Sequence, residues 1–586
     1  ITVVSKPFTD NSAGSATGIN ISSSSNAAKN GYVVNASLNS VDIYAESADT
    51  ENHRVKGIWI SGGYNPSPGS TDDPAASTLT IAGDLNVETI STGGYSIGIN
   101  VGDELGNQNG LGTGKLYLNG HTNEITVVQS ARSNGGSYAR ASAGILASNH
   151  AQIEIESATT NITTKTEHFG SLATIQGGII LDDASSLTVA NNLKIDSTAA
   201  NNSASNVLFG LSLDYIASCL YQSDAGSTAT LGGITSITLR TNNKTIGYGL
   251  ASYGNSSIIS NGLVQVTLDD AQENIGGINR FGAVYAGSTY TKLSNTASNG
   301  YIDTMYGGYV ELNGGLVVSL PETMKPGREN VYALVADGES LKPLLRDPTV
   351  IARGDVDDVY QLYGNVNADR TGRIELTMAN AQSFLTGWAD NHAQDSSTVE
   401  GSVDLALKNG ATWNLVSKIG ADGTVKQDAS RINTLELNGG FLNMTYASVN
   451  NLVDWEDAGH RQVLYITDTD AGHGLTGTGG TIAMDINLSN EGNAVNGLNL
   501  DQIIVNGETS GTHTLSVNFI NGLSAVPDDK WHSENWLISQ GSGNMTLTGP
   551  NGRSEISDTG MVSVWNIKFV PDGQESLLDS DRESLS

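Results

Sequence analysis

A short glycine-led phrase recurs along the first half of the chain and limits what the chain can fold into. Each copy consists of glycine, an apolar residue, any residue, and then a small or apolar residue. The copies begin at Gly18, Gly57, Gly98, Gly144, Gly178, Gly210, Gly249 and Gly282, with a weaker one at Gly308. Successive glycines lie 26 to 46 residues apart. Self-similarity at this spacing is typical of solenoid repeats.

Two alternating runs follow most of the glycine phrases. After Gly57 they are Ser77–Ile81 and Leu85–Ile90, and after Gly144 the first is Gln152–Glu156. Alternation of apolar and polar residues predicts half-buried β-strands. A strand this short cannot bury its apolar face alone, whereas stacked units share one continuous stripe of Ile, Leu and Val. The sequence therefore predicts an all-β solenoid with three strands in each unit, in which the strands are fixed and the loops vary.

The composition agrees with such a fold and excludes two classes of partner. Glycine is abundant at 69 residues and proline is scarce at 11, which suits a chain that turns often. The formal net charge is −32. Nucleic acid and anionic membrane surfaces would be repelled by this charge, so neither is expected as a partner. Solubility is the simplest explanation of the acidity.

The low cysteine content is informative about the cellular compartment in which the protein resides. Cys219 is the single cysteine, so the chain has no internal disulfide. Near-absence of cysteine in a long chain favours export through a periplasm and a location at the bacterial cell surface or outside the cell. No apolar run approaches the ~20 residues of a membrane helix. The sequence starts at Ile1 without a signal peptide, and we expect a mature or trimmed chain.

The repeat pattern divides the chain into five predicted regions. Residues 1–320 are predicted to form an N-terminal β-helix with variable flank loops. The pattern breaks at Pro321, and 321–358 are predicted to be an insertion or loop region. Further coils are expected over 359–488, a tryptophan-rich cap over 489–571, and a disordered acidic linker over 572–586.

Several segments of the second half resemble a known family. They are Asn380–Gly387, Gly401–Leu415, Thr434–Gly440, Gly480–Asp485, Leu500–Gly507, Gly511–Val517 and Asp558–Phe569. Together these segments resemble the passenger domains of AIDA-type and pertactin-like autotransporters. The resemblance covers about residues 359–570, whereas residues 1–320 match only in architecture.

This resemblance implies a right-handed parallel β-helix with a C-terminal autochaperone cap. It also implies export through an outer-membrane barrel that lies outside this chain, and the barrel would be the only link to a membrane. The family's usual roles are adhesion to host cells and self-association of bacteria. Specificity within a fold must nevertheless be argued from a site.

The sequence lacks several common catalytic and metal-binding motifs. The chain contains neither a Gly-Asp-Ser-Gly tetrapeptide nor a Gly-x-Ser-x-Gly elbow, so a serine protease is not expected. The nine histidines show no His-x-x-x-His pair, and no glycine-aspartate calcium repeat is present. We expect no catalytic residue, cofactor or metal. Acidic doublets such as Asp182-Asp183, and Gly472-His-Gly474, keep a polysaccharide-acting hydrolase or lyase as the alternative.

Two sets of residues are candidates for binding. Arg353, Gly354 and Asp355 form an Arg-Gly-Asp tripeptide of the kind found in some integrin ligands. Its glycine and aspartate equally suit a simple turn. The second set contains aromatic residues that are candidates for stacking on sugar rings, with packing beneath a loop as the competing role: Trp59, Tyr64, Tyr95 and Tyr138.

Three functions remain open at this stage. The first is an autotransporter passenger that acts as an adhesin, binding a host glycan or protein or another copy of itself in bacterial aggregates and biofilm. The second is a polysaccharide-acting enzyme on the same scaffold, which requires a cleft with two carboxylates about 5–10 Å apart. The third is a surface scaffold without a ligand of its own.

Overall fold

A computed structural model provides the coordinates of the chain and describes part of it. The described residues are 1–6, 16–22, 34–47, 54–62, 76–92, 94–102, 113–130, 140–166, 174–199, 206–215, 226–241, 245–270, 280–293, 302–321, 326–338, 344–392, 400–420, 422–426, 428–450, 461–487, 499–519, 538–549, 555–559 and 564–568.

The chain divides into two compact units. Unit 1 contains Ile1–Gly354, Asp358–Leu376 and Asn391–Ser402. Unit 2 contains Asp355–Asp357, Thr377–Asp390 and Val403–Ser586. The division falls inside β32 (Arg373–Met378) and β35 (Ser402–Lys408).

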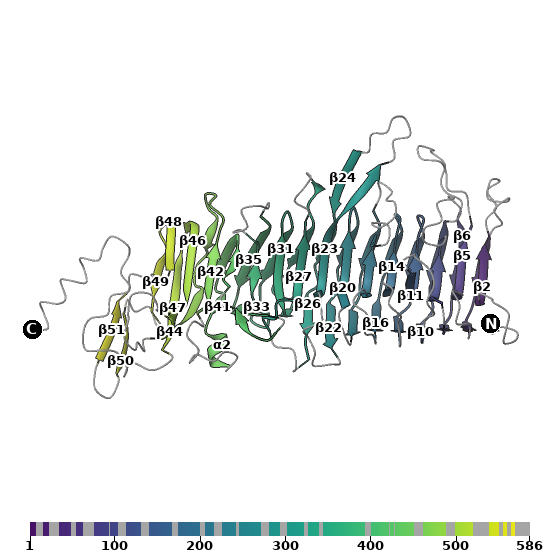
Figure 1. The fold of residues 1–586 in the computed structure, drawn as a ribbon, viewed down its shortest axis with the longest axis horizontal. Coiled ribbons are helices and arrows are strands. Elements are labelled where there is room, and N and C mark those ends of the chain that lie inside the picture. Colours follow the sequence, from purple (N-terminus) through teal and green to yellow (C-terminus); the bar gives the residue numbers. More distant parts are fainter. Residues whose placement is uncertain are drawn as a thin grey trace, which may run out of the picture. The chain divides into compact units, whose positions relative to one another are not determined.

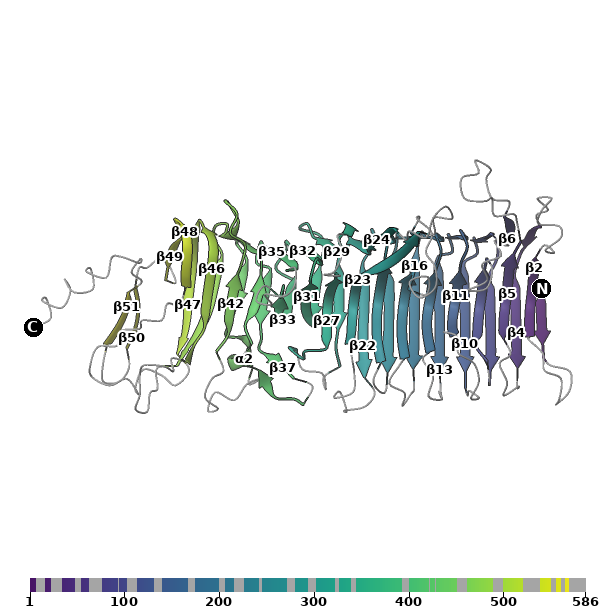
Figure 2. The ribbon, with the colours of Figure 1, turned by 45° about the horizontal axis from the view of Figure 1, so that its top comes forward.

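Unit 1 consists of three parallel sheets through which the chain passes in turn (Figures 1 and 2). Sheet A contains β1 (Thr2–Ser5), β4 (Val41–Ser47), β7 (Leu85–Ser91), β10 (Thr122–Gln129), β13 (Thr159–Thr166), β16 (Asn192–Ala199), β19 (Thr235–Thr241), β22 (Val264–Asp270), β26 (Leu316–Ser319) and β30 (Tyr360–Tyr363). Sheet B contains β2 (Ala16–Ser22), β5 (Val55–Ser61), β8 (Ser96–Val101), β11 (Arg140–Ala147), β14 (Thr174–Leu181), β17 (Asn206–Leu213), β20 (Thr245–Tyr253), β23 (Arg280–Leu293), β27 (Val331–Asp337) and β31 (Asn365–Asp369). Sheet C contains β3 (Asn35–Leu38), β6 (Ser77–Ile81), β9 (Gly114–Leu118), β12 (Gln152–Ile155), β15 (Ser186–Val189), β18 (Thr228–Leu231), β21 (Ser257–Ser260), β25 (Tyr309–Leu312) and β29 (Thr349–Arg353).

This arrangement confirms the predicted all-β, parallel β-helix. The glycine phrases from Gly18 to Gly249 lie in sheet B, the first alternating runs lie in sheet C and the second runs lie in sheet A. Each strand pairs with the equivalent strand of the next coil, so apolar side chains form continuous columns. In sheet C one column contains Leu79, Leu116 and Ile153, all of them fully buried.

The glycines of sheet B are required by close packing against sheet A. A Cβ added at Gly144 would lie 2.1 Å from Ile162 Cγ2 and 2.7 Å from the Gly178 carbonyl oxygen. The other six positions from Gly18 to Gly249 show the same two contacts, to a β-branched side chain of sheet A and to the next coil, at 2.3 to 2.8 Å. Side chains do not tolerate such distances, so these seven positions exclude every residue with a Cβ while the coils keep their spacing.

Two of the predicted glycine positions are wrong. Gly282 pairs with Tyr248, and Val284 pairs with Leu250, so Ala283 rather than Gly282 continues the ladder after Gly249. Gly308 precedes β25 and therefore opens a strand of sheet C. Register is set by pairing along the whole strand, which the local phrase does not determine.

The predicted insertion at 321–358 is also corrected. β27 continues sheet B between β23 and β31, and β29 continues sheet C after β25. The prolines of this region lie outside those strands, and the Val331–Asp337 run is buried over most of its length. Val331–Asp337 and Thr349–Arg353 are therefore parts of a regular coil.

Sheet B of unit 1 carries a small additional sheet, called the arm, which is formed by the C-terminal half of β23 with β24 (Ile302–Gly307) and β28 (Leu344–Arg346). The C-terminal half of β23 pairs antiparallel with β24, and β28 pairs with β24. Figure 1 shows β24 extending past the edge of the neighbouring coil strands.

Unit 2 also consists of parallel ladders, with strands of three to eight residues. One ladder contains β33 (Phe384–Gly387), β36 (Thr412–Leu415), β41 (Phe441–Asn443), β44 (Thr481–Asn487), β47 (Thr512–Phe519) and β49 (Thr546–Thr548). The second contains β35, β39 (Ser430–Ile432), β40 (Thr434–Asn438), β42 (Val463–Ile466), β43 (Gly474–Thr476), β46 (Gln502–Thr509) and β48 (Ile538–Gly543). Minor elements are β34 (Ala389–Asp390), β37 (Lys418–Ile419), β38 (Val425–Lys426), β45 (Asn499–Leu500), β50 (Glu555–Thr559) and β51 (Val564–Lys568).

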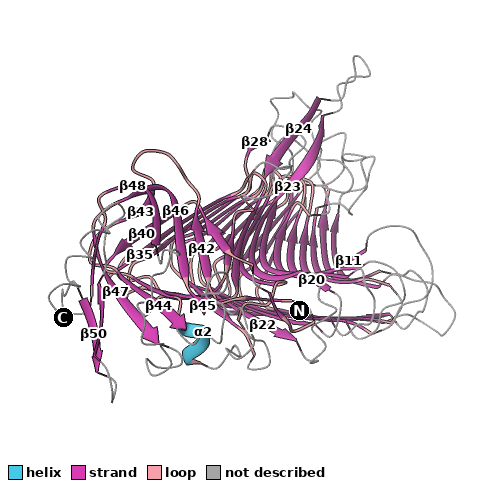
Figure 3. Ribbon diagram, turned by 60° about the vertical axis from the view of Figure 1, so that its left-hand side comes forward, coloured by secondary structure: helices cyan, strands magenta, loops and turns pink. Residues whose placement is uncertain are grey.

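In the part of the chain that the structure describes, α2 (Tyr446–Val449) is the single α-helix (Figure 3). A membrane-spanning helix is not found among those residues. Coil pairing continues through β49 inside the predicted cap region. The predicted linker 572–586 lies outside the described residues.

Candidate functional site

The Arg-Gly-Asp tripeptide begins at the last residue of β29. Arg353 belongs to unit 1 and its guanidinium donates to Glu375 Oε2 at 2.7 Å, although its side chain remains 59% exposed. Asp355 belongs to unit 2 and is exposed, and its Oδ1 accepts from the Asp357 backbone N–H at 2.9 Å. Each charged side chain therefore has a local structural partner, as expected of a turn.

Two of the four predicted aromatic residues are described, and both rings already have a cation nearby. Trp59 is half-buried on β5, with Lys56 Nζ 3.7 Å from its ring centroid, and its indole N–H donates to the Gly102 carbonyl at 3.2 Å. The half-buried Tyr95 ring lies 5.2 Å from the Arg54 guanidinium. These contacts favour a packing role for both residues. Tyr64 and Tyr138 lie outside the described residues.

A larger aromatic cluster in unit 1 was missed by the sequence analysis. The rings of Tyr248 and Tyr285 stack at 4.3 Å, and Tyr253 lies 5.0 Å from Tyr285. These three residues are at most 8% exposed. The signal was present in the sequence, since an aromatic residue directly precedes Gly210 and Gly249. The cluster stabilises sheet B and offers no open ring face to a ligand.

An exposed turn between β42 and β43 gathers three metal-type ligands. One ligand atom from each of Asp468, Asp470 and His473 lies within 4.8 Å of the others. His473 Nδ1 is 2.8 Å from Asp468 Oδ2, and this hydrogen bond raises the pKa of His473. The pKa of Asp468 is lowered overall. Burial alone would raise it, but the hydrogen bonds from the Asp470 backbone and from His473 have the larger combined effect. The histidine–aspartate pair itself accounts for this geometry.

A polar row runs along the solvent side of sheet A in unit 1. Its members occupy one register position in successive coils: Asp42, Asn86, Glu124, Asn161, Lys194, Ser236 and Gln265. Within it Asn86 donates to Asp42 at 2.8 Å, and Asn161 donates to Glu124 at 2.6 Å. The row presents regularly spaced hydrogen-bonding groups at the spacing of the strands, about 4.8 Å.

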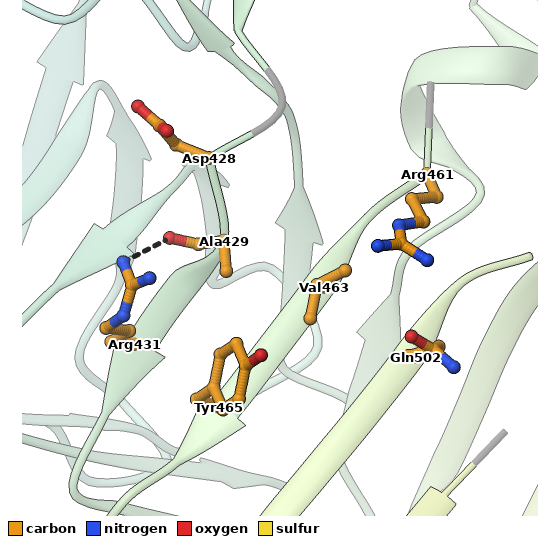
Figure 4. A pocket seen from close by; sticks show the side chains of 7 residues that line it. All are labelled: Asp428, Ala429, Arg431, Arg461, Val463, Tyr465 and Gln502. Atoms are coloured by element: carbon orange, nitrogen blue, oxygen red, sulfur yellow. Dashed lines mark hydrogen bonds between the residues drawn. The ribbon is translucent and has the colours of Figure 1, made fainter. Parts of the chain in front are cut away.

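A concavity lies in unit 2, on the outer side of β39, β42 and β46. It has a volume of about 200 Å³ and is lined by Asp428, Ala429, Arg431, Arg461, Val463, Tyr465 and Gln502 (Figure 4). Alternation explains the lining, because Ile432, Leu464 and Ile503 are fully buried and their neighbours therefore face outward. Register pairs Arg431 with Tyr465, and Val463 with Gln502.

Charged groups surround this pocket. Arg431 donates to the Ala429 carbonyl at 3.2 Å, and its guanidinium lies 5.6 Å from the Tyr465 ring centroid. Behind it, Asp390 accepts from Lys418 at 2.7 Å and lies 4.0 Å from Arg431. Arg431 is therefore held in place by the fold.

None of the residues predicted from sequence lines this pocket. Its residues belong to three segments, 428–431, 461–465 and Gln502, which are separated by about 30 to 40 positions in the chain, and only the stacking of coils brings these segments together. No local motif marks them. The sequence matches no family model, and no curated protein matches it at a significant level.

Proposed function

We propose that this chain is an adhesin of the autotransporter passenger class, exposed at the bacterial surface or secreted. Its role would be to bind a host glycan or protein, or another copy of itself. The observation that supports this best is the pocket of unit 2, where an aromatic ring and polar side chains line an outward-facing hollow on a stacked scaffold. Such a combination is typical of sites that bind small molecules.

Two further features favour binding over catalysis. The pocket lining includes one carboxylate, Asp428, whereas hydrolysis of a glycosidic bond uses a pair. The polar row of sheet A supplies many weak hydrogen bonds, which become effective when many copies on one cell meet many on another. The alternative remains a polysaccharide-acting enzyme.

The test is display of the full chain on a non-adherent bacterial strain. We expect display to increase attachment to host-cell monolayers, or clumping in standing culture, relative to the same strain without the chain. Purified chain is incubated in parallel with a panel of bacterial, plant and host polysaccharides. Absence of both attachment and clumping contradicts the adhesin, and release of new reducing or unsaturated ends would support the enzyme instead.

A further inference from the structure

The pocket of unit 2 contains charged groups that the fold does not use. In the described part of the chain, neither Arg461 nor Asp428 forms a hydrogen bond or an ion pair, and both residues are exposed. Arg431 in the same pocket is held by the Ala429 carbonyl and lies near Asp390. The contrast separates a structural arginine from one whose guanidinium is available to a ligand.

The shape of the pocket limits what the ligand can be. Figure 4 shows Val463 and Tyr465 on one strand, with Arg431 and Asp428 on one side and Arg461 and Gln502 on the other. An apolar and aromatic floor suits the C–H face of a pyranose ring. The volume of about 200 Å³ is below the roughly 300–1,000 Å³ of pockets for drug-sized molecules. One sugar ring fits it better than a longer ligand does.

The local charge limits the ligand further. The pocket lining carries two cations, Arg431 and Arg461, and one carboxylate, Asp428. The adjacent Lys418 and Asp390 form an ion pair with no net charge, so the site has one positive charge in excess. The whole chain carries −32 and repels anions at a distance. Selection of an acidic ligand must therefore act at contact, where a guanidinium binds a carboxylate through two parallel hydrogen bonds.

We propose that this pocket binds a single carboxylated sugar residue, a hexuronate or a sialate. The sugar carboxylate pairs with the Arg461 guanidinium, the ring lies on Tyr465 and Val463, and ring hydroxyls donate to Asp428 and Gln502. This inference rests on the proposed function only in taking a glycan as the ligand class.

The test is calorimetric titration of the full chain with four probes. They are a hexuronate tetrasaccharide, sialyllactose, the same tetrasaccharide after reduction of its carboxyl groups, and lactose. We expect one or both acidic probes to bind, and reduction of the carboxyls to weaken binding about ten- to hundredfold, as loss of a charge-assisted hydrogen bond implies. The probe that binds distinguishes the two sugar sources.

Variants locate the site. Arg461→Gln is expected to lose the same factor for the acidic probe and to leave binding of the reduced probe unchanged. Arg373→Gln removes an exposed arginine from unit 1 and is the matched control, with no expected effect. Circular dichroism melting of each variant checks the fold. The proposal is overturned if neither acidic probe binds, if acidic and reduced probes bind equally, or if Arg461→Gln changes nothing.

The two proposals fail in different ways. If displayed cells attach but no acidic probe binds, the pocket assignment is wrong and the adhesin stands. If the acidic probe binds in an Arg461-dependent manner but displayed cells neither attach nor clump, the pocket stands and the adhesin fails.

Discussion

At the scale of single residues, the absence of a side chain is as constraining as any contact. Seven glycines of sheet B, from Gly18 to Gly249, each face a β-branched residue of the same coil, such as Val87 for Gly57. The facing residues themselves form a column, in which Ile125 pairs with Ile162 and Ile162 with Ile195. Glycine recurs at these seven positions because a Cβ would have no room there, and not because the backbone conformation requires glycine.

Gly144→Ala tests this constraint. The added methyl group must displace Ile162 or widen the gap to the next coil, which costs about 1–3 kcal/mol in other overpacked cores. We expect a lower melting temperature by circular dichroism. Ala283→Gly is the matched control on the same ladder, with a cost of about 0.5–1 kcal/mol from backbone entropy. Equal melting of Gly144→Ala and wild type would refute the close packing.

A buried pair of acids makes the stability of unit 2 depend on pH. Asp501 is fully buried, and its carboxylate accepts from the backbone N–H groups of Gln462 and Asp485 at 2.8 Å each. Burial raises the pKa of Asp501 well above its usual value, and the neighbouring Asp485 carboxylate adds to this. Asp485 itself accepts from Ser448 and Asn518, and burial raises its pKa as well.

The direction in which stability changes with pH follows from the difference between the pKa values of the folded and unfolded states. A carboxyl whose pKa is raised on folding holds its proton more firmly in the folded state. Its contribution is fully present below the unfolded pKa of about 3.9 and is lost as the pH rises through the folded pKa. We therefore expect Asp501→Asn to gain stability relative to wild type as the pH rises from 4 to 8, measured by urea denaturation. A difference that is constant with pH would show that Asp501 does not titrate in this range.

At the scale of elements, the Arg346 side chain links the arm of unit 1 to the coils. Arg346 on β28 donates from Nε to the Gly307 carbonyl at 2.8 Å, and from Nη2 to the Ser256 carbonyl at 2.7 Å and the Gly254 carbonyl at 3.2 Å. The guanidinium thus joins the base of β24 to the turn before β21.

Arg346→Ala should loosen the arm without disturbing the coils. Removal of the guanidinium leaves three carbonyls without this donor, which weakens the local structure by about 1–3 kcal/mol. Hydrogen exchange followed by mass spectrometry should show faster exchange in β24 and unchanged exchange in β14. Arg373→Ala, which removes an exposed ion pair, is the control. Faster exchange throughout unit 1 would mean that Arg346 supports the coils themselves.

The elements were largely predictable, and the pocket was not. Period-2 runs such as Gln152–Glu156 predict strands because one face is buried, and the glycine phrase locates sheet B. Gly282 was misassigned because Ala283 is small enough to take the ladder position. The region 321–358 was misassigned because prolines outside the strands interrupt the repeat pattern around Val331–Asp337. Arg431 lies on β39, whereas Tyr465 lies on β42 and Arg461 lies just before it. The two strands are far apart in the sequence, so no local pattern brings these residues together.

At the scale of the whole molecule, parallel stacking underlies both proposals. The polar row of unit 1 and the pocket of unit 2 exist because equivalent positions in successive coils lie side by side. The charge of −32 keeps such chains soluble, and it requires that any adhesion be short-ranged, through hydrogen bonds and local pairs. Function on this scaffold is then decided by which side chains occupy the outward columns.

Disulfide trapping tests that stacking most directly. In a Cys219→Ser background, Asn86→Cys with Glu124→Cys places thiols on register partners of β7 and β10, about 4.8 Å apart along the sheet. Asn86→Cys with Asn161→Cys is the control, because these positions lie two coils apart and beyond the about 7 Å limit for a disulfide. In-register parallel coils predict oxidation of the first pair and free thiols in the second. Free thiols in the first pair, or cross-linking of the second, would contradict the account.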